Sequence, residues 1–307
     1  MEYKPISGRE FPRFSGIKTF FRMPYVALDA DYDVGIFGIP YDGAVSYRPG
    51  ARFAPQKVRD LSSLGRGYHM SREISFIDKL KVADIGDCPT VPIDQEKCYK
   101  RIQEFTAKVL KNDKKFIAVG GDHSVTLPIL RELKKKYKTP IRLIHFDAHF
   151  DTYPAAWDCE YHHGTFVRHA VEEKLIDPEE SHQFGIRGPL ASADDLAFVR
   201  KHKINVHTVD TIREEGIPGR LKKVSHLDDV PTYISFDIDC LDPAYAPGTG
   251  TPVCGGLTTY ETQKILRGLN IKNLVGADIV EVCPAYDPTE ITALAAADTM
   301  FEFLCMF

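Results

Sequence analysis

The stretch FIAVGGDHSVTLPILRELKKKYKTPIRLIHF, from Phe116 to Phe146, decides the fold class. It opens with the apolar run Phe116–Val119, turns at two glycines, continues as a helical pattern over Leu127–Tyr137 and ends in the apolar run Ile141–Phe146. Short apolar runs without polar alternation are typical of strands buried on both faces. The order strand, helix, strand predicts two parallel strands joined by a right-handed crossover.

The same alternation extends along most of the chain. Further apolar runs predict strands at Val34–Ile39, Gln183–Ile186, Val206–Val209, Tyr233–Ile238 and Val275–Val282. Further helical patterns lie at Ile102–Leu110, Thr165–Glu173, Asp194–His202, Tyr260–Leu269 and Ile291–Phe307. No linker-like or repetitive segment interrupts them. We therefore predict an α/β fold of three layers, with a mainly parallel β-sheet flanked by helices on both faces, in a single domain spanning residues 1–307.

The composition points to a small-molecule partner. A net charge of −4, from 39 basic and 43 acidic residues, offers no electrostatic footprint for nucleic acid or an anionic membrane. The seven cysteines form no C-x-x-C pair, which favours a reducing compartment and argues against a structural zinc site. No segment has the roughly 18 uninterrupted apolar residues that span a bilayer, and the start resembles no signal peptide. We expect a soluble, cytoplasmic protein.

Acidic and histidine side chains gather where three of the expected strands end. The segments are Asp122-His123, Asp147-Ala-His149-Phe-Asp151 and Asp237-Ile-Asp239. In an extended chain, residues two apart project to the same side, so the members of the last two segments can converge. Ligand sites of parallel sheets lie beyond the carboxyl ends of the strands. The sequence therefore predicts one cluster of oxygen and imidazole ligands there.

Four carboxylates in such a cluster would raise one another's pKa unless cations neutralised them. Two divalent ions balance that charge. Oxygen and nitrogen ligands without thiolate favour a hard or borderline metal such as Mn²⁺, and they leave Co, Ni and Zn open. Two ions about 3.5–4 Å apart can share a water and lower its pKa from about 15.7 towards about 7. The pattern thus predicts a hydrolytic metal centre.

Several residues near these segments have simpler interpretations. An Asp at a strand end often caps a helix or forms a turn, which suits Asp122 and Asp242. His145 is interpreted as a histidine packed within its strand. The histidines without a motif are interpreted as surface or packing residues: His69, His169, His182, His202, His207 and His226.

Taken together, five segments resemble the ureohydrolase family, which includes arginase, agmatinase and related guanidino-acid hydrolases. In chain order they are Gly120-Gly-Asp-His-Ser124, Asp147-Ala-His-Phe-Asp151, His163-Gly-Thr165, Ser235-Phe-Asp-Ile-Asp-Cys-Leu-Asp-Pro-Ala-Tyr-Ala-Pro-Gly-Thr-Gly-Thr-Pro252 and Asp278-Ile-Val-Glu-Val282. Chance agreement at all five is negligible. The resemblance implies a binuclear manganese site at the carboxyl edge of a parallel sheet, a small guanidino substrate, and a homo-oligomer, trimer or hexamer.

The resemblance also implies a role for each site residue. One ion would be held by His123, Asp147, Asp151 and Asp237, and the other by Asp147, His149, Asp237 and Asp239. Glu281 would hold the guanidinium, a planar cation that a carboxylate can bind bidentately. Asp151 would pass a proton to the departing amine. His163 would shuttle protons, a role that suits an imidazole because its pKa lies near neutrality.

The resemblance to subgroups of this family bears on the substrate. Hydrolysis would release urea and a primary amine, and the stretches 185–188, 246–252 and 284–297 look more like agmatinase than arginase. Agmatine, which would yield putrescine, is therefore the first choice. Guanidinobutyrase and proclavaminate amidinohydrolase share these stretches, which leaves a guanidino acid open. Arginine is expected to be poor, because Tyr153 stands where arginases place an Asn that binds the α-carboxylate.

Most of the residues that would surround the substrate lie outside the five motif segments, so the sequence predicts their roles least well. Tyr153 and Trp157 are predicted to form an aromatic wall, with Asp158 or Glu160 near the ammonium of agmatine. Phe150 stands where small or polar residues are more usual in the family, and it bears on substrate choice. A non-catalytic metal-binding scaffold is the rival hypothesis, and it is disfavoured because none of the expected ligands is missing.

Overall fold

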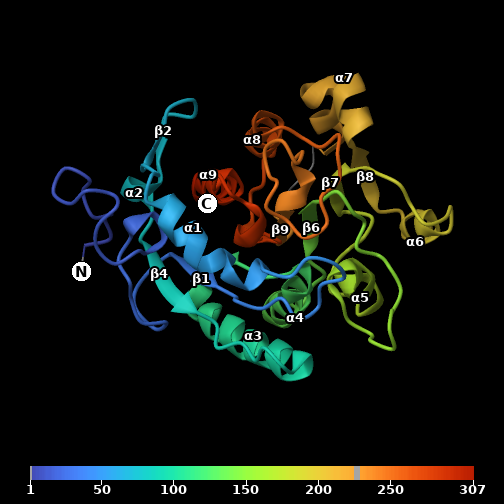
Figure 1. The fold of residues 1–307 in the computed structure, drawn as a ribbon, viewed down its shortest axis with the longest axis horizontal. Helices are drawn as coiled ribbons and strands as arrows, with labels where there is room; N and C mark the ends of the chain where they lie inside the picture. Colours follow the sequence, from blue (N-terminus) through green and yellow to red (C-terminus); the bar gives the residue numbers. More distant parts are fainter. Residues whose placement is uncertain (1, 225–228) are drawn as a thin grey trace.

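An eight-stranded sheet forms the centre of the molecule (Figure 1). In spatial order its strands are β4 (Val82–Asp87), β1 (Val34–Gly38), β5 (Lys115–Val119), β10 (Leu274–Val280), β9 (Thr232–Asp237), β6 (Arg142–Phe146), β7 (His182–Ile186) and β8 (Asn205–Thr208). Each adjacent pair runs parallel. This computed structural model describes residues 2–224 and 229–307, so His226 lies outside the described residues.

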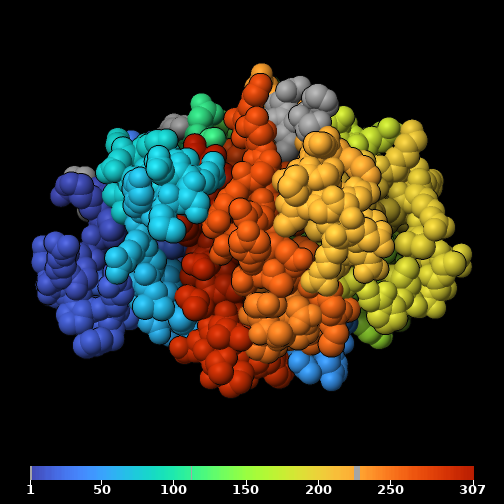
Figure 2. Space-filling view, turned by 90° about the horizontal axis from the view of Figure 1, so that it is seen from above, coloured from blue at the N-terminus to red at the C-terminus, as the bar shows by residue number. Residues whose placement is uncertain are grey.

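The strands are not laid down in sequence order. After β5 the chain passes to β6, β7 and β8, and only then returns to place β9 and β10 in the gap between β5 and β6. Figure 2 shows the same pattern at the surface, where the late orange and red segments lie between the earlier cyan and gold ones. The carboxyl ends of β5, β10, β9 and β6 are therefore neighbours, and each of these strands leads into one of the motif segments.

Helices cover both faces of the sheet. One face carries α1 (Ala54–Ser62), α7 (Val209–Leu221), α8 (Thr259–Gly268) and α9 (Ile291–Leu304); the other carries α3 (Gln95–Val109), α4 (Thr126–Tyr137), α5 (Phe166–Glu172) and α6 (Asp195–His202) (Figure 1). Ile36 and Phe37, adjacent in β1, belong to different hydrophobic cores, as alternation along a strand requires. The predicted three-layer α/β fold is confirmed.

Shorter elements complete the structure. The helix α2 (Phe76–Lys79) follows an antiparallel hairpin of β2 (Tyr68–His69) and β3 (Ile74–Ser75). Single 3₁₀ turns occur at Phe20–Arg22, Ala51–Phe53, Lys111–Asp113, His123–Val125, His163–Thr165, Lys222–Val224, Ile238–Cys240 and Pro284–Tyr286. None of the described helices combines the length and the apolar character that crossing a lipid bilayer would need.

The edge strand β4 is absent from the predicted strands because Asp84 and Gly86 interrupt its apolar run. Asp84 is fully buried, and its carboxylate accepts from the Arg59 side chain (Nε to Oδ2, 2.8 Å) and from the Phe20 amide (3.0 Å). A buried charge is tolerated when it is paired and hydrogen-bonded in this way. The strand thus depends on a partner in α1 that the local pattern does not reveal.

Candidate active site

A cavity of about 210 Å³ opens at the carboxyl edge of the sheet. It is lined by Ser46, His149, Asp151, Tyr153, His162, His163, Gly164, Asp237 and Thr251. These residues follow β1, β6 and β9, strands far apart in the sequence. The topology therefore brings together the segments that the sequence marks as carrying the chemistry.

His123 is the centre of a first group of ligands. Its Nδ1 lies 3.0 Å from Asp147 Oδ2, 3.1 Å from Asp151 Oδ2 and 3.2 Å from Asp237 Oδ2. All four side chains are buried. This set is the one expected for the first ion.

The contact of His123 Nε2 shows which tautomer the neutral ring adopts. Nε2 lies 2.9 Å from Ser235 Oγ, and that hydroxyl donates to Asp278 Oδ1 at 2.7 Å. Since the hydroxyl has a single proton, it accepts the Nε2–H of His123. In the neutral ring, which is the form that can bind a metal, Nδ1 is therefore the bare lone pair; it is a buried atom without a hydrogen-bond partner in the described chain. A lone pair facing three carboxylate oxygens fits a metal cation.

His149 is the centre of a second group. Its Nδ1 lies 3.2 Å from Asp147 Oδ1 and 3.1 Å from Asp239 Oδ2. Asp147 thus presents one oxygen to each group, as a bridging ligand does. The His149 side chain is a quarter exposed and lines the cavity together with Asp151 and Asp237 of the first group, so both groups are open to a small molecule. Asp237 contacts His123 of the first group. Its predicted role as a second bridging ligand stays a prediction.

In Asp147 and Asp237 one carboxylate oxygen forms a turn and the other faces the first group. Asp147 Oδ1 accepts from the His149 amide at 2.6 Å, and Asp237 Oδ1 accepts from the Asp239 amide at 2.7 Å. In each residue Oδ2 is left to face His123. The turns therefore aim the ligand oxygens.

Asp122 and Asp242 differ from these ligands because both of their oxygens accept from backbone amides. Asp122 accepts from Ser124 and Ala44, and Asp242 accepts from Ala244, Gly255 and Gly256. The expectation that these two residues cap and form turns is confirmed.

The cluster holds more negative charge than it can carry alone. Burial, together with Asp239 and Asp147, raises the pKa of Asp237 well above its usual range. Burial would also raise the pKa of Asp147, but the surrounding histidines 145, 123 and 149 hold it well below. Neighbouring carboxylates pushed in opposite directions cannot all be ionised without cations. Residues His123, Asp147 and Asp151, and separately Asp147, His149 and Asp239, offer atoms close enough to share an ion.

Glu281 lies beside the first group in a strained conformation. Its φ of 63° is in the left-handed region, which costs a non-glycine residue of the order of 1–3 kcal/mol and is common at functional sites. Its Oε1 accepts from the His123 amide at 2.8 Å, whereas Oε2 is buried and has no partner among the described residues. A Cβ on Gly250 would come within 3.3 Å of that oxygen. Oε2 is thus a buried acceptor without a partner in the described chain, and Glu281 itself is not among the lining residues of the cavity.

His163 joins Glu281 to the cavity. Its Nδ1 lies 2.9 Å from Glu281 Oε1, and its Nε2 lies 2.7 Å from the Ser46 hydroxyl. Burial alone would lower the pKa of His163, but the adjacent Glu281 raises it to about 9. Ser46 was not among the predicted site residues. Its stretch, Ser46-Tyr-Arg-Pro-Gly50, contains no acidic or histidine residue that would mark it as part of the site.

The predicted aromatic wall is only partly in the cavity. Tyr153 lines it, but Trp157 is 70% exposed at a turn and is not among the lining residues. Asp158 and Glu160 are exposed and also lie outside the lining. Phe150 is buried in the hydrophobic core on the α3–α6 face, so its side chain does not form the cavity floor.

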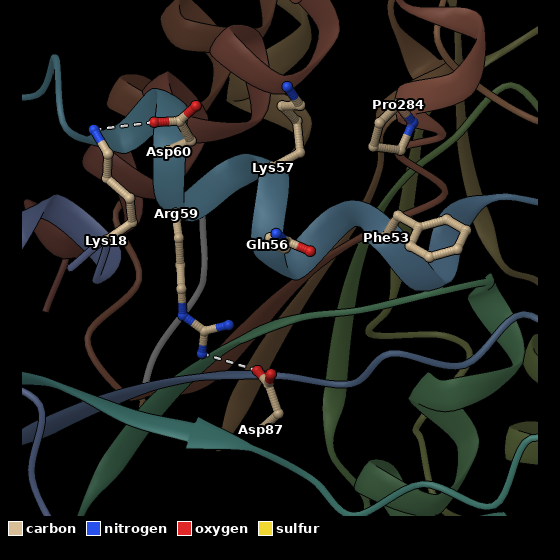
Figure 3. Close-up of a pocket in the computed structure, with 8 residues that line it drawn as sticks. All are labelled: Lys18, Phe53, Gln56, Lys57, Arg59, Asp60, Asp87 and Pro284. Carbon is tan, nitrogen blue, oxygen red and sulfur yellow. Dashed lines mark ion pairs between the residues drawn. The ribbon is translucent and has the colours of Figure 1, made fainter. Parts of the chain in front are cut away.

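A larger cavity, of about 660 Å³, lies beside α1 (Figure 3). None of the motif residues lines it. Two of its cations are already paired, Lys18 with Asp60 at 3.1 Å and Arg59 with Asp87 at 2.8 Å. Chemistry rather than volume therefore distinguishes the candidate site.

Comparison with known proteins agrees with this geometry. A family model described as "Arginase family" matches residues 32–306. The chain belongs to the arginase family. A guanidinopropionase from Pseudomonas aeruginosa is 45% identical, with 99% of this chain and 95% of the relative covered. An agmatinase from Cronobacter sakazakii is 42% identical, with 93% and 91% covered.

Solved structures show the same relationship. The proclavaminate amidinohydrolase from Streptomyces clavuligerus has a TM-score of 0.91 and 41% identity, covering 96% of this chain and 98% of that one. The predicted membership of an agmatinase-like group of ureohydrolases is confirmed, and the chain is an arginase-family hydrolase of guanidino compounds. Members of the family depend on metal ions, for which the His and Asp cluster offers ligands.

Proposed function

We propose that this protein hydrolyses the guanidino group of a short guanidino acid to urea and a primary amine, with two Mn²⁺ ions bound by the cluster. The observation that carries the metal centre is the bare Nδ1 of His123 facing three carboxylates, with Asp147 shared by the His149 group. The expected ligands are His123, Asp147, His149, Asp151, Asp237 and Asp239. When bound, the ions would supply Lewis acidity and would lower the pKa of the attacking water.

The chain's own residues bind the substrate and move protons. Glu281 accepts the guanidinium through its free Oε2, a charge-assisted contact that orients the carbon under attack. Asp151, which lines the cavity, receives the proton from water and gives it to the departing amine. His163, held between Glu281 and Ser46, carries protons between the site and solvent.

The cavity lining favours a guanidino acid over agmatine. Among the described residues, the carboxylates in the lining are Asp151 and Asp237, which belong to the metal cluster, so an ammonium would find no further acid there. The hydroxyls of Ser46 and Thr251 already bond to His163 and Asp239. Within the described chain this leaves the Tyr153 phenol free to donate to a substrate carboxylate. The guanidinopropionase relative supports the same choice.

Agmatine is the second candidate. It is the substrate that the sequence favoured, and the agmatinase relative is almost as similar to this chain as the guanidinopropionase. Asp158 and Glu160 would then have to approach the cavity from their exposed positions. Trp157 would approach with them.

A urea-release panel tests the proposal. The Mn²⁺-loaded protein is assayed with 3-guanidinopropionate, 4-guanidinobutyrate, agmatine and arginine, with Glu281→Gln as the matched control. We expect the highest kcat/KM with a guanidino acid and little activity with arginine, whose α-ammonium has no acid partner in the lining. Preference for agmatine would replace the substrate but keep the reaction. No urea from any compound would reject the function.

Two further expectations stay predictions. A homo-oligomer, trimer or hexamer, is implied by the family resemblance and is testable by light scattering of the purified protein. A cytoplasmic location is the second.

A further inference from the structure

A row of buried polar side chains crosses the sheet directly beneath the cluster. Asp278 of β10 is in register with Ser235 of β9, Ser235 with His145 of β6, and His145 with Gln183 of β7. Each of these side chains is at most 1% exposed. Asp147 comes directly after the end of β6, two residues beyond His145, and so projects to the same face. Ser235 and Asp278 orient the His123 ring. His145 and Gln183, the other two members of the row, have no role in the mechanism above.

The amide orientation of Gln183 is settled by its contacts. Its Nε2 lies 2.8 Å from the backbone carbonyl oxygen of Phe150 and 2.9 Å from His145 Nδ1. A carbonyl oxygen only accepts hydrogen bonds, so the amide NH₂, and not the amide oxygen, must face Phe150. The second N–H of this NH₂ group then points to His145, and Nδ1 of His145 is the acceptor.

This orientation fixes the tautomer of His145. With Nδ1 accepting, the proton of the neutral ring is on Nε2, which lies 2.9 Å from Asp147 Oδ2. Although His145 is close enough to the first group to be considered a ligand, a protonated Nε2 donates and does not coordinate a metal. His145 therefore supports Asp147 from behind.

We propose that His145 and Gln183 are positioning residues that hold Asp147 and the Asp147–Asp151 turn in the geometry that binds metal. His145 donates to Oδ2 of the shared carboxylate. Gln183 holds His145 and also the carbonyl of Phe150, which lies between the ligands His149 and Asp151. Loss of such supporting contacts typically costs about 10–100-fold in metal affinity. The inference rests on the proposed metal centre.

The test measures Mn²⁺ binding to the metal-free full-length protein, with free Mn²⁺ followed by its EPR signal. His145→Phe and Gln183→Leu are expected to weaken binding about 10–100-fold. His145→Gln places an amide NH₂ near the original Nε2, and we expect it to recover most of the affinity. This rescue separates donation to Asp147 from mere filling of the core. The EPR coupling between two bound ions is a second readout, because it depends on the orientation of a shared carboxylate.

The matched control is His182→Phe, which alters the buried residue next to Gln183 on the opposite face of β7. It should leave Mn²⁺ affinity unchanged. If His145→Phe fails to fold, Gln183→Leu decides the question. Wild-type affinity and coupling in Gln183→Leu would overturn the inference while leaving the proposed function intact. If the wild-type protein binds no Mn²⁺, the metal centre and this inference fall together.

Discussion

His123 of the metal cluster and the pair His182–His207 are all buried, yet their pKa values move in opposite directions. Burial disfavours the imidazolium in each place. At His123 the carboxylates of Asp147, Asp151 and Asp237 overcome burial and hold its pKa well above the usual range. At the pair, burial and neighbouring cations act together and lower the pKa of His182 to about 4 and that of His207 to about 3.

The hydrogen bonds of the pair agree with this difference. Arg220 donates to His207 Nδ1 at 2.6 Å, so His207 carries its proton on Nε2 and donates it to His182 Nδ1 at 3.0 Å. Two neutral rings are required in this arrangement. Burial alone therefore does not mark a functional histidine. The charge of the neighbouring side chains makes the difference: carboxylates around His123 favour a cation, whereas arginines near the His182–His207 pair disfavour one.

The largest expected effect comes from removing the carboxylate shared by both groups. Asp147→Ala should lose both ions and lower activity by more than about a thousandfold, because the nucleophile depends on the metals. Asp237→Ala should be more damaging than Asp239→Ala, since Asp237 is assigned to both ions. Metal analysis and urea release measure this. If these variants kept two ions per chain and near-normal activity, the assignment of these carboxylates as metal ligands would be wrong. The contrast between the cluster and the His182–His207 pair would then have no basis.

Next in size is His163→Ala. A group that moves protons without binding metal is worth about 10²–10⁴-fold in rate. We expect kcat to fall by this factor while the Mn²⁺ content stays at the wild-type value. Loss of metal from this variant would instead place His163 among the ligands. Ser46→Ala, which removes the hydroxyl contact with Nε2 and keeps that of the Ser46 amide, should have a smaller effect of the same kind.

Much of this arrangement could be predicted from local sequence. Seven of the main-sheet strands follow from apolar runs, because all of them except the edge strand β8 are buried on both faces. β4 could not be found this way, since Asp84 is stabilised by Arg59 from another element. The kinked α7 was also missed, because Gly216 and Pro218 interrupt its helical pattern.

The candidate site shows the same limit. The Asp-x-His-x-Asp and Asp-x-Asp spacings predicted that these side chains lie together, as they do, because the spacing of a turn or strand end is a local property. The supporting contacts are not local: Ser46 meets His163, and Gln183 meets His145, only after distant strands pair. Trp157 is the opposite case. An aromatic side chain close to the metal motif suggested a wall of the pocket, but the turn that carries Trp157 leaves the side chain exposed to solvent.

The smallest expected effect concerns the stability of the His182–His207 pair towards acid. Their folded-state pKa values, about 4 and about 3, lie below the ordinary value of 6.5. The unfolded chain therefore takes up protons first, and the free energy of unfolding falls as the pH drops from 6.5 towards 4. Each pKa unit corresponds to about 1.4 kcal/mol, so the loss should reach a few kcal/mol.

His207→Phe tests this dependence, because a phenyl ring can keep the stack on Phe184, whose ring lies 4.2 Å away, but cannot take up a proton. At pH 7.5 the variant should be less stable, since Arg220 loses the acceptor of its Nε–H. Between pH 6.5 and pH 4 its unfolding free energy should fall less steeply than that of the wild type. Denaturant unfolding in the presence of a chelator measures both slopes without a contribution from the metal cluster. Equal slopes would mean that the pair is not held neutral in the folded protein. The proposed difference in charge between the cluster histidines and the His182–His207 pair would then be wrong for the pair.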